Sequence, residues 1–176
     1  MTIRNLIHRF LADEDATATV EFVIVFPVLL MVFISAFETA MILTRQVMLE
    51  RAVDSTVRYL RLTSGISVTH DQIRQNICDN ALLLPNCVET LLLDVRVVNR
   101  NTYQLPDSDT LCVDLGGTVT PANSFHPGAQ NDLMLLRACA LVERILPTSG
   151  YGLKLTQDDQ GFMHMMVSTI FVNEPD

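Results

Sequence analysis

The chain has 176 residues and a formal net charge of −8, with 49% hydrophobic and 18% charged residues. This length and apolar content suit one packed domain together with an apolar segment. An acidic chain without a cluster of lysines and arginines does not fit a nucleic-acid-binding protein, so we expect no nucleic acid among its partners.

Residues 1–16 form a short leader of mixed charge. Its apolar residues from Ile3 to Phe10 recur at helical spacing, which favours a short amphipathic turn at a membrane surface. Three acidic residues close the leader, at Asp13, Glu14 and Asp15.

An uncharged, almost wholly apolar run extends from Phe22 to Phe37, with Glu21 and Glu38 at its two ends. Extended to Leu43, the run reaches about 33 Å at about 1.5 Å per helical residue. That length is enough to cross a bilayer. Carboxylates are costly beside a lipid-facing helix, so both glutamates are candidate functional residues.

We therefore divide the chain into a cytoplasmic leader over 1–16, a transmembrane helix over 17–43 and an extracytoplasmic α+β domain over 44–176. Pro27 lies inside the transmembrane helix, where proline removes a backbone donor and favours a kink. We also expect the helix to continue to about residue 63, because the next stop signal is Gly65.

The second half of this long helix is apolar on one stripe only. We expect the stripe to pack on the chain's own sheet, although a coiled coil with a partner is an alternative. The residues of the stripe are Leu49, Val53, Thr56, Val57 and Leu60.

The remainder of the chain shows mixed patterns. Helical spacing predicts a helix over His70–Leu84, ended by Pro85. Two strands are expected next, over Thr90–Asn99 and Thr110–Leu115, followed by a turn at Gly116 and Gly117 and a loop over Thr118–Asn131. The segment Leu133–Ile145 fits a helix or a strand, and Phe162–Val172 is predicted as the last strand. The predicted fold class is α+β, with the long N-terminal helix packed on a small antiparallel sheet.

Four cysteines occur, at Cys78, Cys87, Cys112 and Cys139. No C-x-x-C pair and no histidine at zinc-finger spacing accompanies them, so we expect no metal and no cofactor. An even number of cysteines beside an export-type segment favours two disulfides in an oxidising compartment, with four reduced core cysteines as the alternative. Cys78 with Cys87, across Pro85, and Cys112 with Cys139 are the favoured pairs.

The orientation of the chain in the membrane receives opposing signals. Arginines are more numerous after the apolar run than before it, which by the positive-inside rule would keep the domain in the cytoplasm. The cysteines favour the reverse, with the N terminus in the cytoplasm and the domain in the periplasm, and we adopt that orientation.

No nucleophile elbow, H-E-x-x-H or phosphate-binding loop is present in the sequence, so we do not expect an enzyme.

The segment from Ala16 to Phe22, reading A-T-A-T-V-E-F, precedes an apolar run that contains Pro27 and ends in Glu38. This pattern resembles the TadE-like proteins, which are minor pilins or pseudopilins of the tight-adherence (Flp, type IVc) pilus. The polar helix over Gln46–Arg61 and the ending Asn173-Glu174-Pro175 are similar to that family as well.

The resemblance implies that a prepilin peptidase cuts between Ala16 and Thr17, at a site where the family usually has glycine before the cut. Glu21 then becomes the fifth residue and neutralises the new ammonium group of a neighbouring subunit, a pairing that lowers the cost of two charges at an apolar boundary. Phe22, Pro27 and Glu38 complete the set of assembly residues.

The partners that the resemblance implies are the bacterial inner membrane, the prepilin peptidase, other pilin or pseudopilin subunits and the pilus assembly platform. Two other functions fit the residues: a non-polymerising single-pass envelope scaffold, or a secreted, disulfide-bonded binding domain with a cleaved signal peptide. The plainer role of Glu21 is an interfacial acid at a helix start, and that of Glu38 is an acid facing lipid headgroups.

Overall fold

The computed structural model describes residues 17–62, 68–103, 105, 128–143 and 161–174. Three helices and three strands lie in these ranges: α2 (Thr17–Leu62), α3 (His70–Asn80), α4 (Cys87–Thr90), β1 (Leu91–Val97), β2 (Leu133–Glu143) and β3 (Phe162–Val172). The strands form one antiparallel sheet in the order β1-β2-β3. The predicted α+β class, a long N-terminal helix on a small antiparallel sheet, is confirmed.

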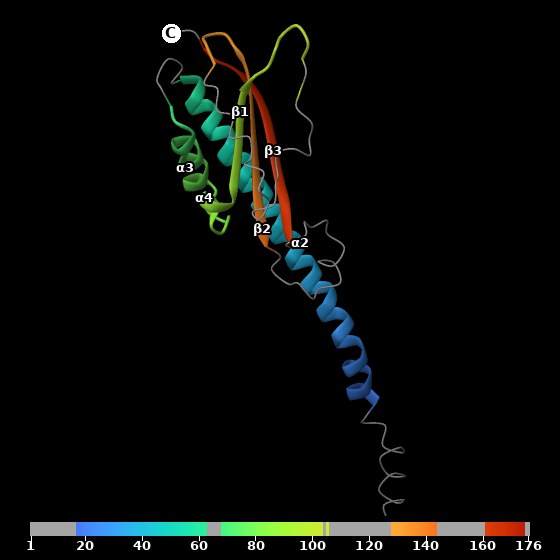
Figure 1. Cartoon of the computed structure of the whole chain (residues 1–176). Helices are drawn as coiled ribbons and strands as arrows, with labels where there is room; N and C mark the ends of the chain where they lie inside the picture. The colour runs from blue at the N-terminus through green and yellow to red at the C-terminus, as the bar shows by residue number, and fades with distance from the viewer. Residues whose placement is uncertain (1–16, 63–67, 104, 106–127, 144–160, 175–176) are drawn as a thin grey trace, which may run out of the picture.

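Helix α2 is a single helix of 46 residues that runs through Pro27 without a break. Figure 1 shows its N-terminal half standing clear of the domain and its C-terminal half lying against the sheet. Ile42 is the first α2 residue that packs against the core. The predicted stripe is confirmed as a core face, because Leu49, Val53 and Val57 are buried there.

Helix α3 fastens α2 to the rest of the domain. Its start is fixed by a capping box, in which the Gln72 backbone N–H donates to the Thr69 hydroxyl and the Gln72 side chain accepts from the Thr69 backbone N–H. Ile73 and Ile77, one turn apart, are its buried residues. The Thr56 hydroxyl of α2 lies 2.9 Å from Asn76 Oδ1, which joins the two helices.

The end of α3 differs from the prediction. The helix stops at Asn80 rather than continuing to Leu84, and Ala81 is its C-cap. A tight turn follows, closed by a hydrogen bond from Leu84 N–H to the Ala81 carbonyl (3.0 Å). The single-turn helix α4 comes next; it was not predicted, and it occupies the first residue expected in the strand that became β1.

Strand β2 settles the helix-or-strand ambiguity of residues 133–145, because it is the central strand of the sheet. Every residue from Met134 to Val142 is buried. Alternate residues such as Leu136 and Ala138 belong to the core shared with α2 and α3. Leu135 and Leu141, on the other face, are equally buried but stand outside that core.

The remaining strand predictions have mixed outcomes. Strand β3 has the predicted bounds, and β1 is shorter than expected at both ends. The leader over 1–16 and the expected strand over 110–115, with its turn at 116 and 117, lie outside the described residues.

Candidate functional site

The free half of α2 exposes apolar side chains around its whole circumference. Among the described residues, α2 is the one helix long and apolar enough to cross a membrane, and none of its most apolar stretch is buried in the domain. The exposed side chains include Val20, Val23, Ile24, Val28, Met31, Val32 and Phe33. Such a surface is stable in lipid and costly in water, which supports a membrane anchor.

Three hydroxyls near the middle of α2 have hydrogen-bond partners within the helix. Ser35 Oγ donates to the Met31 carbonyl at 2.8 Å, and Thr39 Oγ1 donates to the Ser35 carbonyl at 2.8 Å. Thr44 Oγ1 donates in the same way to the Ala40 carbonyl. Because lipid offers no hydrogen-bond partner, this internal satisfaction lets the helix carry hydroxyls inside a membrane.

Glu21 and Phe22 lie on the exposed part of α2, far from the domain. The side chain of Glu21 is exposed, and the Phe22 ring stacks on that of Phe26 with a centroid distance of 5.0 Å. Ile42 begins the core contact 21 positions further along, which corresponds to about 32 Å of helix. Glu21 is therefore positioned for contacts outside its own domain.

Glu38 has the opposite surroundings. Its exposed fraction is 0%, and it takes part in an interaction within the chain. This differs from an acid facing lipid headgroups, the plainer role considered from the sequence. The reason is tertiary: the spacing of residues along a helix does not show what folds back against it.

Two of the four cysteines form the local bridge expected from the sequence. Cys78 at the end of α3 and Cys87 at the start of α4 are disulfide-bonded, with Cα atoms 5.6 Å apart. Cys139 on β2 is disulfide-bonded as well. Its expected partner, Cys112, lies outside the described residues.

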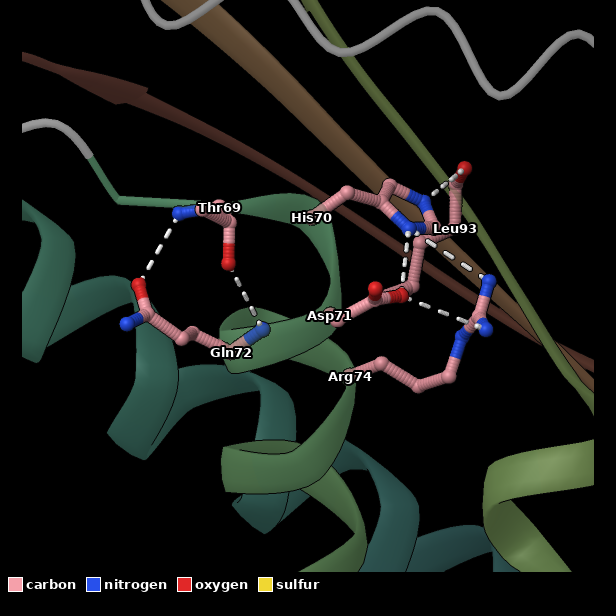
Figure 2. Close-up of polar contacts among 6 residues, drawn as sticks. All are labelled: Thr69, His70, Asp71, Gln72, Arg74 and Leu93. Carbon is pink, nitrogen blue, oxygen red and sulfur yellow. Dashed lines mark hydrogen bonds and ion pairs between the residues drawn. The ribbon is translucent and has the colours of Figure 1, made fainter.

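A polar cluster at the N terminus of α3, which sequence reasoning missed, joins that helix to β1 (Figure 2). His70 Nε2 lies 3.3 Å from the Leu93 carbonyl, which can only accept, so Nε2 carries the proton. His70 Nδ1 lies 3.4 Å from Arg74 Nη2 and 3.9 Å from Asp71 Oδ1, and the Arg74 guanidinium lies 3.7 Å from the same carboxylate. The cluster holds α3 in place. The capping pair Thr69 and Gln72 is a sequence signal that could have located this helix start, and the prediction did not use it.

The described ranges contain no group of three or more histidine, cysteine, aspartate or glutamate side chains that could hold a metal ion. The candidate functional features of this part of the chain are the exposed apolar half of α2, Glu21, Glu38 and the disulfide between α3 and α4.

Comparison with known proteins assigns the N-terminal part of the chain. No curated protein and no solved structure matches it. One family model does match, described as TadE-like protein, over residues 16–58. The match includes Ala16, Glu21, Pro27 and Glu38, and it covers nearly the whole of α2. The family resemblance seen in the sequence is confirmed over residues 16–58, about a quarter of the chain, which match the TadE-like family model.

Proposed function

We propose that this protein is a membrane-anchored minor pilin or pseudopilin that takes part in the assembly of a tight-adherence pilus for adhesion or secretion. The observation that carries the proposal is the coincidence of the TadE-like match with α2. One half of that helix is an exposed apolar anchor, and the other half is built into the core of an α+β domain.

The proposed topology has the leader in the cytoplasm, α2 across the inner membrane over 17–43, and the domain in the periplasm. The disulfide between Cys78 and Cys87 supports an oxidising compartment for the domain. Ile42, the first α2 residue packed against the hydrophobic core, supports a boundary between anchor and domain close to residue 43. The burial of Glu38 puts the first contact of α2 with the rest of the chain one helical turn earlier.

The proposed maturation is a cut between Ala16 and Thr17 by a prepilin peptidase, which leaves Glu21 as the fifth residue. The exposure of Glu21, about 32 Å of helix before the core, leaves its carboxylate accessible to the N-terminal ammonium of a neighbouring subunit. A carboxylate and an ammonium at an apolar boundary attract each other strongly, and each is costly alone. Phe22 and Pro27, on the same free half, would contact neighbouring helices.

The two alternative functions predict a mature protein that begins at a residue other than Thr17. A secreted domain would lose about 40 residues as a signal peptide, but that cut removes Glu38, which is completely buried within the fold. A single-pass scaffold that never polymerises would keep the whole leader.

The test is the intact mass and N-terminal sequence of the full chain, extracted from membranes of cells with and without the prepilin peptidase. We expect a protein that begins at Thr17 only when the peptidase is present, and Ala16→Gly should be processed at least as well as wild type. A chain that begins at Met1 in both strains would overturn the proposed maturation and favour the scaffold.

A further inference from the structure

The turn between α3 and α4 exposes two leucines at its tip. The hydrogen bond from Leu84 N–H to the Ala81 carbonyl makes Leu82 and Leu83 the two central residues of the turn. Ala81 and Leu84 on either side are buried, whereas Leu82 is 81% exposed and Leu83 is 38% exposed. Central turn positions are usually taken by glycine, proline, asparagine or aspartate, so a pair of exposed leucines there calls for an apolar partner.

The leucine tip, defined as Leu82 and Leu83, is held rigidly. The Cys78–Cys87 disulfide closes the loop that contains it, and Cys87 is buried against the core. A fixed loop loses little conformational freedom when its tip binds, so its apolar surface is preorganised for contact.

The leucine tip lies at the membrane-facing end of the domain. Figure 1 shows the turn before α4 at the end of the domain from which the free half of α2 departs. Ile42, the first α2 residue packed against the hydrophobic core, directly precedes Leu43, the last residue of the expected transmembrane helix. When α2 spans a bilayer, this end of the domain therefore stands at the bilayer surface.

The charges near the tip limit how deeply it can enter. Asp79 and Glu89 line the hollow beside the disulfide and need to remain in water. The tip can therefore reach the boundary of headgroups and acyl chains but not the hydrocarbon centre. The two carboxylates also favour zwitterionic over anionic lipid.

We propose that the leucine tip docks into the interfacial layer of the same bilayer that α2 spans. The contact gives the domain a second point of attachment beside its helix and thereby fixes its tilt on the membrane. This inference rests on the proposed membrane anchor. It assigns to a periplasmic turn a lipid-binding role outside the family-matched segment 16–58.

The test uses tryptophan as a reporter, because the chain contains none. Leu82→Trp puts one reporter at the tip, and Leu62→Trp is the matched control, since Leu62 is 80% exposed but lies at the far end of α2. Phe33→Trp, at a position 66% exposed on the free half, reports insertion of α2 itself. Each full-length variant is reconstituted into phosphatidylcholine vesicles with and without brominated acyl chains.

We expect the emission of Leu82→Trp to shift to shorter wavelength and to lose intensity in brominated lipid, while Leu62→Trp shows neither change. Quenching of Phe33→Trp together with no quenching of Leu82→Trp would overturn the docking proposal and leave the anchor intact. Absence of quenching at Phe33→Trp would overturn the anchor itself. A shifted but unquenched Leu82→Trp would indicate contact with protein and would also overturn the lipid assignment.

Discussion

The two glutamates that bracket the apolar run should respond differently to the same substitution. Glu38 has an exposed fraction of 0% and is engaged in an interaction within the chain, so Glu38→Ala removes that interaction from a fully buried position. Hydrogen bonds to charged groups contribute about 1.5–3 kcal/mol. That loss lowers the folding equilibrium constant by about 10- to 150-fold, at about 1.4 kcal/mol for each factor of ten.

The assay is thermal unfolding of the full chain in detergent micelles, followed by pulse proteolysis of the domain. Each kcal/mol lowers the Tm of domains of this size range by about 2–8 °C, so Glu38→Ala should lose about 3 °C or more. Glu21→Ala is the matched control, because Glu21 is exposed on the free half of α2 and should leave the Tm unchanged. Equal Tm values for wild type and Glu38→Ala would refute the reasoning that Glu38 stabilises the domain.

Two further predictions use other positions on α2. Glu21→Ala, expressed at the same membrane level as wild type, should lose piliation in a complementation assay while its disulfides still form; normal piliation would reduce Glu21 to an interfacial acid. Leu49→Ala should destabilise the domain by about 2–5 kcal/mol, because Leu49 is fully buried in the core. Val47→Ala, which truncates a half-exposed neighbour, should change stability by less than about 0.5 kcal/mol in the same unfolding assay.

The parts of the fold that were predictable from sequence have either a strong helical period or an apolar run rich in β-branched residues. Helix α2 and its buried stripe follow from apolar residues at helical spacing, such as Leu49, Val53 and Val57. Strand β3 was placed correctly because β-branched residues gather at its end, in the segment that includes Thr169 and Ile170. In the second half of α2 one stripe is apolar and the other positions are mostly polar, so the period shows which face is buried.

The ambiguous part was β2, and the reason lies in its position. A central strand covered on both faces has no alternation, and the buried run from Met134 to Val142 reads equally well as helix or strand. The burial of Glu38 could not be predicted either, because it depends on contacts between segments distant in sequence. The start of α3, by contrast, was placed at His70 by the helical spacing of apolar residues such as Ile73 and Ile77; the capping box of Thr69 and Gln72 is a further signal that the prediction did not use.

Because α2 is one continuous helix, it also fixes the rotation of the membrane anchor relative to the domain. Successive residues turn by about 100° around the helix axis, so Glu21, seventeen positions before Glu38, points about 100° away from it. Adding one residue between Glu38 and Leu49 would rotate the whole anchor by about 100° relative to the domain while moving it by only about 1.5 Å. A neighbouring subunit that contacts Glu21 therefore lies on one defined side of the domain, and the helix fixes which side that is.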